Sequence, residues 1–160
     1  MIDSKIILVG AGASGKDFLR KRFQDRGFKF AVTHVTRPIR PTEENGIDCH
    51  FVSKDEFTEM ILEGQLIEYN IHNGWYYGTS VATFEECDVF TMTPSGLSQL
   101  SKGDRARSFV IYLDIPEEIR RSRLDSRVMP GDTTERRLAT DMVDFSNFTD
   151  YDLRIVNEDF

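Results

Sequence analysis

The stretch KIILVGAGASGKD, at residues 5–17, sets an apolar run directly before a group of glycines. Residues 5–9 are typical of a buried parallel strand, and the pattern predicts a helix over about 16–24. Between them, residues 10–16 match G-x-x-x-x-G-K, in which small residues let backbone N–H groups turn inward around phosphate oxygens. The helix would add its positive end, so the stretch predicts a phosphate loop, with an ordinary strand-to-helix turn as the alternative. The loop residues are Gly10, Ala11, Gly12, Ala13, Ser14, Gly15, Lys16 and Asp17.

Further apolar runs at residues 90–92 and 109–113 are separated by helix-like sequence, which predicts an α/β fold with a mainly parallel sheet. A second helix is expected from Ser53, because Ser53 and Glu56 form a capping box, and Gly64 is expected to end it. A third should begin at a first-turn proline and run over about 116–125. Between Phe28 and Tyr77 short alternating strands and a tight His72-Asn73-Gly74 turn indicate an insertion on the core.

Composition limits the partners of the chain. The 160 residues carry a net charge of -7 with a pI near 5.0, which argues against binding to a nucleic-acid polymer. There is no long apolar run and no charged-then-apolar leader, so we expect one soluble, cytoplasmic domain that does not bind membranes. The two cysteines, Cys49 and Cys87, follow no metal-ligand spacing. Small phosphorylated ligands remain possible, because a few well-placed arginines suffice to bind them.

The residue after Lys16 is Asp17, where a phosphate loop normally has a Ser or Thr hydroxyl that ligates Mg²⁺. A carboxylate is also a hard oxygen ligand, so Asp17 is the candidate metal ligand. The alternative is that its negative charge beside the β-phosphate weakens nucleotide binding.

Residues 30–80 resemble the nucleoside-monophosphate-binding region of guanylate kinases. The shared pattern is T-R-x-x-R-x-x-E-x-N-G-x-D, then F-V-S-x-x-E-F, then a glutamate and Y-Y-G. With the phosphate loop, a later R-L-x-x-R and the closing V-N-E-D, the likeness spans nearly the whole chain. It implies a P-loop core (1–32, 81–122 and 138–160), an inserted substrate region (33–80), a helical lid (about 123–137), and transfer of the γ-phosphoryl of ATP to GMP or dGMP with Mg²⁺. A monomer or homodimer is expected.

The resemblance also implies roles for single residues. Arg37, Arg40 and Tyr77 correspond to residues that clamp the acceptor phosphate, and Glu68 to the carboxylate that accepts hydrogen bonds from guanine. Taken alone, the arginines would read as solvated loop residues and Tyr77 and Glu68 as ordinary strand residues. The remaining implied acceptor residues are Thr33, Gly78, Thr79 and Thr93.

The lid should carry arginines that reach the phosphates on closure, because phosphoryl transfer depends on positioning and on positive charge at the transferring oxygens. The segment MPGDTTE, residues 129–135, is its predicted flexible part. The resemblance implies that Arg123, Arg127 and Arg137 act with Lys16 and Arg37 in catalysis, and that Asn157 contacts the adenine of ATP. We expect Arg120, Arg121 and Arg136 to be solvated helix charges.

Three departures from the family pattern concern the acceptor. Cys49 stands where the family has a second phosphate-binding tyrosine, and Thr91 and Thr93 stand where two aspartates are expected. Two alternatives follow: a kinase for another acceptor, such as a modified deoxynucleoside monophosphate or ribose 1,5-bisphosphate, and a non-catalytic module that binds phosphorylated peptides. Retention of Glu68 with both loop arginines favours a nucleobase acceptor, and retention of Lys16 and Arg123 favours catalysis.

Overall fold

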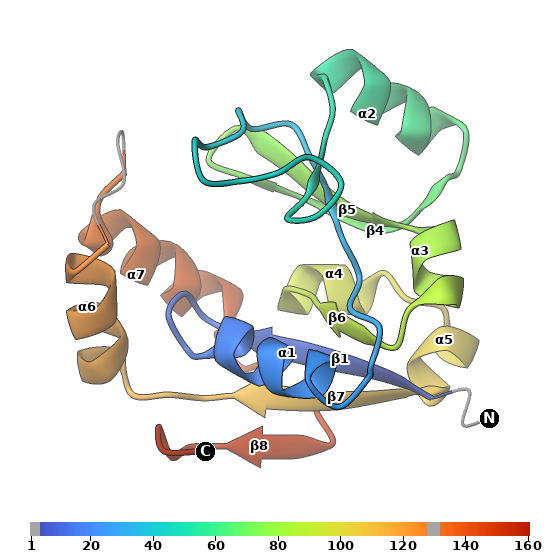
Figure 1. The fold of residues 1–160 in the computed structure, drawn as a ribbon. Helices are drawn as coiled ribbons and strands as arrows, with labels where there is room; N and C mark the ends of the chain where they lie inside the picture. The colour runs from blue at the N-terminus through green and yellow to red at the C-terminus, as the bar shows by residue number, and fades with distance from the viewer. Residues whose placement is uncertain (1–3, 128–131) are drawn as a thin grey trace.

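A computed structural model describes residues 4–127 and 132–160. Its core is a four-stranded, fully parallel sheet in the order β6-β1-β7-β8 (Figure 1). The strands predicted at 5–9, 90–92 and 109–113 are confirmed, with ends that move by one residue, and β8 is an additional edge strand. The strands are β1 (Lys5–Gly10), β6 (Val89–Thr91), β7 (Ser108–Leu113) and β8 (Leu153–Ile155).

The apolar run of β1 is continuous because both faces of the core sheet are covered. Ile7 and Val9 pack on one face, in a cluster that includes Phe84 and Phe90. Leu8, between them in the sequence, packs on the opposite face with residues of β7 and of helix α1. The side-chain alternation of a strand therefore places successive apolar residues in two separate layers.

Helices surround this sheet, and α1 and α6 confirm the helices predicted at 16–24 and 116–125. Gly15 is the N-terminal cap of α1, and Pro116 stands at the cap position just before α6. The helices outside residues 34–80 are α1 (Lys16–Gln24), α3 (Val81–Glu86), α4 (Pro94–Ser98), α5 (Lys102–Ala106), α6 (Glu117–Asp125) and α7 (Thr134–Asp144). Of the predicted flexible lid segment, residues 129–131 lie outside the described residues.

A second, mixed sheet forms within residues 34–80, in the order β3-β2-β5-β4. The hairpin between β4 and β5 turns at Asn73 and Gly74, whose φ values of 52° and 78° fit a type I′ turn, as the sequence predicts. The capping box of Ser53 and Glu56 is also present at the start of α2. The elements are β2 (His34–Val35), β3 (His50–Phe51), α2 (Lys54–Leu62), β4 (Leu66–His72) and β5 (Trp75–Ser80).

Helix α4 joins the two sheets. Its C-cap residue Gln99 pairs with the backbone of Tyr69 in β4: Gln99 Nε2 donates to Tyr69 O at 2.8 Å, and Tyr69 N donates to Gln99 Oε1 at 3.0 Å. Gly96 of α4 lies against the same strand, because a Cβ built there would come within 2.5 Å of Glu68 Oε2. Residues of β4 are thereby held at a fixed place relative to the core.

The parallel order of the core sheet collects three loops at one edge, because the carboxyl ends of parallel strands lie side by side. The phosphate loop follows β1, residues 92–93 follow β6, and residues 156–160 follow β8. Helices α6 and α7 stand beside this edge, and the second sheet with α2 lies above it in Figure 1. The sequence thus brings distant segments to a common place.

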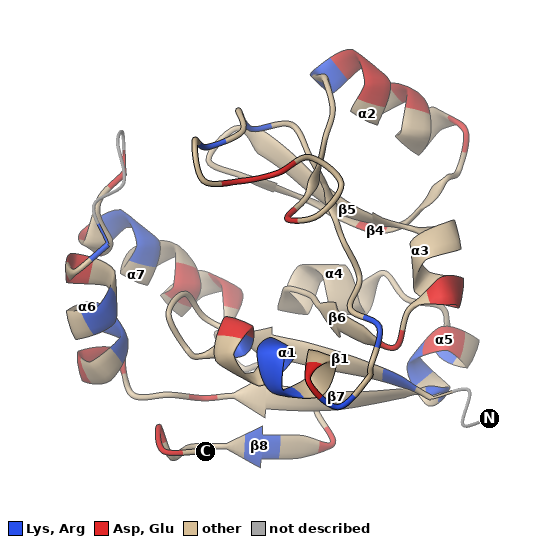
Figure 2. Ribbon diagram, in the orientation of Figure 1, with Lys and Arg blue, Asp and Glu red and all other residues tan. Residues whose placement is uncertain are grey.

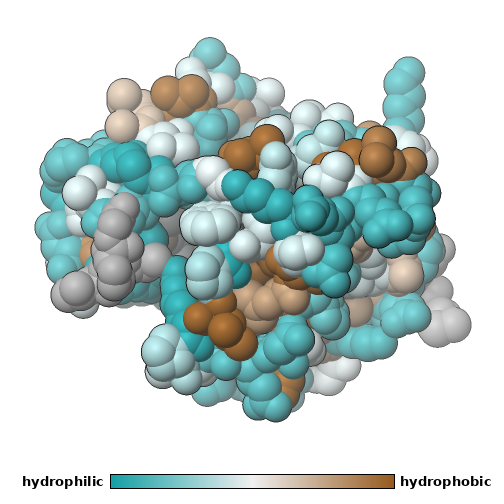
Figure 3. All heavy atoms as spheres, turned by 90° about the horizontal axis from the view of Figure 1, so that it is seen from above, coloured by the Kyte–Doolittle hydropathy of each residue, from teal (hydrophilic) through white to brown (hydrophobic). Residues whose placement is uncertain are grey.

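The surface is mainly polar. Arginines and lysines are frequent on α6 and at the start of α7, while α2 carries several acidic residues (Figure 2). Seen from above, hydrophilic residues cover most of the face and hydrophobic ones form separate groups (Figure 3), in keeping with a mean hydropathy of -0.39. Within residues 4–127 and 132–160, none of the helices has the length and apolar character needed to cross a membrane.

Candidate active site

The loop after β1 has the backbone expected of a phosphate cradle. Ala13 and Gly15 both have positive φ, at 60° and 98°, which turns successive backbone N–H groups toward one concavity. At Gly15 this φ favours glycine, and a Cβ there would also lie 2.8 Å from Cζ of the Phe160 ring, which would have to shift. Ser14 Oγ is buried without a hydrogen-bond partner inside the loop. An orphaned hydroxyl and a glycine cradle fit a phosphorylated ligand.

Lys16 lies at the centre of this loop. Its Nζ donates to Gly10 O at 2.5 Å and to Ala11 O at 3.0 Å. Burial lowers the pKa of Lys16 to about 8, although the nearby carboxylates of Asp141 and Asp17 act in the opposite direction. The ammonium group is therefore held where a phosphate would approach, and an anionic ligand would favour its protonated form.

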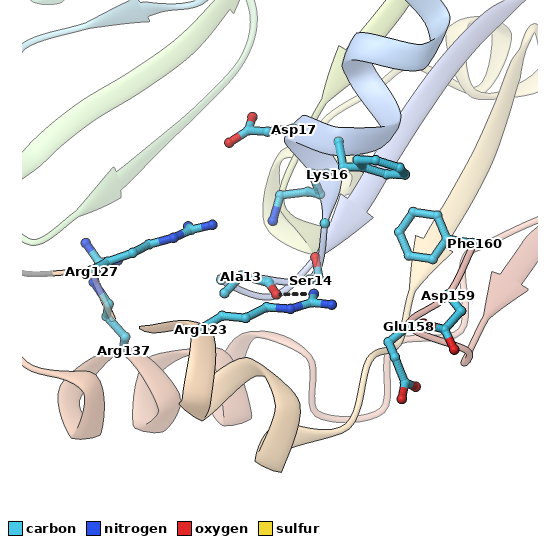
Figure 4. A pocket seen from close by; sticks show the side chains of 13 residues that line it. Ala13, Ser14, Lys16, Asp17, Arg123, Arg127, Arg137, Glu158, Asp159 and Phe160 are labelled. Carbon is cyan, nitrogen blue, oxygen red and sulfur yellow. Dashed lines mark hydrogen bonds between the residues drawn. The ribbon is translucent and has the colours of Figure 1, made fainter. Parts of the chain in front are cut away.

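A cavity of about 750 Å³, here called the loop cavity, lies beside the phosphate loop. Figure 4 shows Arg123 and Arg127 extending toward the loop from the end of α6 and the residues just after it, with Phe160 on the other side of the cavity. Arg123 Nη1 donates to Ala13 O at 3.0 Å. The three arginines expected in the lid all line this cavity, which is bounded by Gly12, Ala13, Ser14, Gly15, Lys16, Asp17, Phe18, Arg123, Arg127, Arg137, Glu158, Asp159 and Phe160.

A second cavity, of about 360 Å³ and here called the β4 cavity, lies between the core and the second sheet. Gly12 and Lys16 line both cavities, so the two spaces meet at the phosphate loop. Five of the predicted acceptor residues line it: Thr33, Glu68, Tyr77, Gly78 and Thr93. The other lining residues are Gly10, Asn70, His72, Thr91, Met92, Asp141, Asp144 and Phe145.

Glu68 is the buried acid of the β4 cavity, with 4% of its surface exposed. Thr79 Oγ1 donates to Glu68 Oε1 at 2.6 Å, and Asn70 Nδ2 donates to Glu68 Oε2 at 3.2 Å. Burial raises the pKa of Glu68 to about 7, and the hydrogen bonds from Thr79 only partly offset that rise. Thr79 does not line the cavity; it orients the carboxylate that does.

Arg37 is held by a partner that the sequence prediction gave no role. Its Nη1 and Nη2 donate to both carboxylate oxygens of Glu43, at 2.8 and 2.6 Å, and both side chains are 14% exposed. The ion pair lowers the pKa of Glu43 to about 2. Burial raises the pKa of Tyr77, an effect that Arg37 and Arg40 oppose, so the two guanidinium groups lie near its phenol. A forked pair of this kind fixes the direction of the Arg37 guanidinium group.

Some predicted residues are not brought into either cavity. Arg37 and Arg40 belong to the loop between β2 and β3, outside the lining of the β4 cavity. Asn157 lines neither cavity; its Oδ1 accepts a hydrogen bond from Asp159 N at 3.0 Å. Asn157 therefore shapes the turn that carries Phe160 to the loop cavity.

A sequence model of the guanylate kinase family matches residues 3–160. The chain belongs to the guanylate kinase family. It is 34% identical to the guanylate kinase of Vibrio parahaemolyticus, over 96% of this chain and 80% of that protein. It is 36% identical to the guanylate kinase of Vibrio cholerae, over 82% of this chain and 67% of that protein. The crystal structure of guanylate kinase from Anaplasma phagocytophilum shares the fold, with a TM-score of 0.72, 23% identity, and coverage of 98% of this chain and 77% of that one.

Two of the three departures from the guanylate kinase pattern line the β4 cavity. These are Thr91 and Thr93, and Thr93 Oγ1 accepts a hydrogen bond from Gly96 N at 3.0 Å, which caps α4. Cys49 is half-buried near Arg37 and Thr33, outside the lining of either cavity; burial raises the pKa of its thiol, and both neighbours oppose the rise. The two threonines therefore change the chemistry of the cavity wall.

Asp141 is a site residue that the sequence reasoning missed. Its Oδ2 accepts from Gly12 N at 3.1 Å and from Arg120 Nη1 at 3.3 Å, so α7 is bonded to the phosphate loop. The prediction that Arg120 is a solvated helix charge is wrong, because its side chain is 12% exposed and paired with Asp141. The sequence spacing could have indicated Asp141 as a site residue, because it follows Arg137 by four residues, which places both on one face of a helix.

The donor set for a divalent cation is small. Among the residues that the structure describes, no three His, Cys, Asp or Glu side chains gather to hold a metal. Asp17 is exposed and lines the loop cavity, where a nucleotide would bring its own phosphate oxygens. Mg²⁺ in such sites is usually held by one or two carboxylates together with phosphates and water, so the residues present fit a nucleotide-borne Mg²⁺.

Proposed function

We propose that the chain transfers the γ-phosphoryl group of ATP to GMP or dGMP, with ATP in the loop cavity and the monophosphate in the β4 cavity. The observation that carries the proposal is the sharing of Gly12 and Lys16 by both cavities. Two ligands bound there would bring their phosphates together at one ammonium group, which is the arrangement that phosphoryl transfer requires.

On the donor side, the backbone N–H groups of residues 10–17 and Lys16 would hold the phosphates of ATP. Arg123 on α6, Arg127 just after the end of α6 and Arg137 on α7 would close around the transferring group, in the manner of a lid. Asn157 would act indirectly, through the turn that places Asp159 and Phe160 at the cavity. The long reach of the arginines into the cavity supports this assignment (Figure 4).

On the acceptor side, Arg37 and Arg40 would bind the phosphate of GMP together with the hydroxyl of Tyr77. Glu68, oriented by Thr79, would accept hydrogen bonds from the guanine ring. Thr33, Gly78 and Thr93 would form the rest of the pocket for the base. The buried hydrogen bond between Thr79 and Glu68 supports this division, because it fixes an acceptor group where the base would lie.

When it is bound with ATP, Mg²⁺ would neutralise charge on the phosphate oxygens, and Asp17 would hold it directly or through water. The side chains of the protein would do the rest by positioning. Lys16 and the arginines would stabilise the charge that spreads over the equatorial oxygens, and closure of α6 and α7 would exclude water that could otherwise hydrolyse ATP. No protein nucleophile is needed, because the acceptor phosphate itself attacks in line.

A coupled assay for ADP with Mg²⁺ tests the proposal against a panel of acceptors: GMP, dGMP, AMP, CMP and ribose 1,5-bisphosphate. We expect turnover with GMP and dGMP, and a loss of at least about 100-fold in Lys16→Met with an unchanged circular dichroism spectrum. Asp25→Asn, an exposed change beyond the end of α1, is the matched control and should leave turnover unchanged. Turnover of ribose 1,5-bisphosphate alone would contradict a nucleotide acceptor.

A further inference from the structure

One face of β4 is polar along its whole length inside the cavity. Glu68, Asn70 and His72 alternate in sequence and all line the β4 cavity. Tyr69 and Ile71, which alternate with them, are exposed on the other face of the strand. Asn70 thus stands next to the carboxylate that would read a base, at a position for which the family resemblance implies no role.

The hydrogen bond of Asn70 fixes the direction of its amide. Asn70 Nδ2 donates to Glu68 Oε2 at 3.2 Å. When Glu68 is ionised, as it must be to accept from two guanine donors, the reversed amide would set two acceptor oxygens against each other. Asn70 Oδ1 is therefore turned away from Glu68, which leaves a neutral acceptor beside a charged one in the cavity.

Thr93 stands where the family has an aspartate at the guanine edge, and its hydroxyl oxygen already accepts another hydrogen bond. Thr93 Oγ1 accepts the hydrogen bond from Gly96 N that caps α4, and a threonine hydroxyl lacks the charge of the aspartate that the family has there. The guanine edge presents three N–H donors, the ring N1–H and the two hydrogens of the exocyclic amine. The two oxygens of the Glu68 carboxylate can accept from N1–H and from the nearer amine hydrogen, which leaves the second amine hydrogen to be satisfied, because a buried donor without a partner is costly.

We propose that Asn70 determines acceptor specificity: its Oδ1 accepts a hydrogen bond from the second hydrogen of the exocyclic amine of guanine, beside Glu68, which accepts from N1–H and from the first amine hydrogen. This inference rests on the proposed function, since it assigns a specificity residue within the same site. An amide is suited to this place because a second carboxylate would repel Glu68 in a buried cavity, whereas a neutral acceptor adds no such repulsion. The role lost at position 93 is thus supplied from β4.

Inosine monophosphate tests the proposal because it keeps N1–H and lacks the exocyclic amine. We expect the wild-type protein to favour GMP over inosine monophosphate by about 10-fold or more in kcat/KM. Asn70→Ala should lower kcat/KM for GMP by about 10-fold, chiefly through KM, and leave inosine monophosphate within about twofold, so that the preference for GMP falls by about the same factor. The KM for ATP should not change.

Ile71→Ala is the matched control, because Ile71 is the next residue of β4 and is exposed on its other face. It should keep the preference for GMP. Asn70→Ser offers a second variant if Asn70→Ala unfolds, and its hydroxyl should retain part of the preference. An equal loss for both nucleotides would overturn the proposal, as would a preference for GMP that is undiminished in Asn70→Ala. If the wild type turns over neither GMP nor dGMP, the proposed function fails. The role of Asn70 is then decided by calorimetry, which compares the binding of GMP and of inosine monophosphate.

Discussion

Protonation of the Glu68 carboxylate links the stability of the folded protein to ligand binding. It is buried between β4, β5 and α4, with partners in Asn70 and Thr79 and close contact with Gly96. Burial raises its pKa from 4.5 to about 7 in the folded protein. The folded state therefore holds the proton more tightly than the unfolded chain. The resulting stability is complete below about pH 4.5 and is lost as the pH rises through 7.

Glu68→Gln removes this titration. At pH 8 the variant should be more stable than the wild type by about 3 kcal/mol, and the difference should shrink toward zero near pH 4.5. Urea unfolding of both proteins at pH 4.5, 6 and 8 measures it; the other ionisable groups of the cavity, including Lys16 and His72, cancel in the difference. The variant should also lose turnover of GMP. A stability difference that does not vary with pH would contradict the assignment.

Some residues of the site could be predicted from the sequence, and others could not. Lys16, Arg123, Arg127 and Glu68 could be named because each lies in a motif with fixed spacing. Asn70 and Asp141 lie in no such motif: Asn70 gains its role from the cavity that β4 lines, and Asp141 from the phosphate loop that α7 reaches only in the folded chain. Asp141 lies 129 residues from Gly12, to which it is bonded. Local spacing cannot report a contact of that kind.

At the scale of elements, α4 positions the base end of the cavity by close approach. A Cβ at Gly96 would lie 2.5 Å from Glu68 Oε2 and 3.1 Å from Asn70 Nδ2, so only glycine allows this helix to approach the strand. Gly96→Ala should therefore push β4 and α4 apart and displace the carboxylate.

We expect Gly96→Ala to raise KM for GMP by about 10-fold or more while KM for ATP stays within about twofold, because the loop cavity does not include α4. Steady-state kinetics with each nucleotide varied in turn measures both constants. Gly103→Ala in α5 is the matched control, since a Cβ there would approach only Ser101 Oγ, at 3.8 Å. Equal changes in both KM values would show a general loss of structure instead.

The elements differ in whether a few neighbouring residues of the sequence are enough to predict them. Helix α2 and the β4–β5 hairpin follow from a capping box and an Asn-Gly turn, and both could be predicted from a few residues. Strand β8 could not, because its three residues are partly exposed and it forms only by pairing with β7. Its place in the sheet matters, since it delivers Phe160 to the loop cavity.

For the whole molecule, Asp141 joins α7 to α6 through Arg120 and to the phosphate loop through Gly12. Both side chains are largely buried, 15% and 12% exposed, and the same carboxylate oxygen accepts from the phosphate loop. Asp141→Ala should lower the free energy of unfolding by about 2 kcal/mol, because it leaves a buried guanidinium and a backbone N–H without their acceptor.

Denaturant unfolding measures this loss. Glu117→Ala is the control, because it breaks the exposed ion pair with Arg121 on the same helix and should cost less than about 1 kcal/mol. Equal costs for the two variants would mean that the bond between α7 and the loop contributes no more than a surface pair. The overall α/β arrangement follows from the apolar runs of the sequence, whereas this bond depends on how α7 packs against the phosphate loop.

The pairing of Gln99 with Tyr69 also opposes association between copies of this chain. β4 is an edge strand of the second sheet, and unpaired edge backbone is a template on which another chain can add a strand. One glutamine amide satisfies both the N–H and the C=O of Tyr69, so a side chain takes the place that an intruding strand would occupy. Gln99, which joins the two sheets, thereby also opposes aggregation of this protein through the β4 edge.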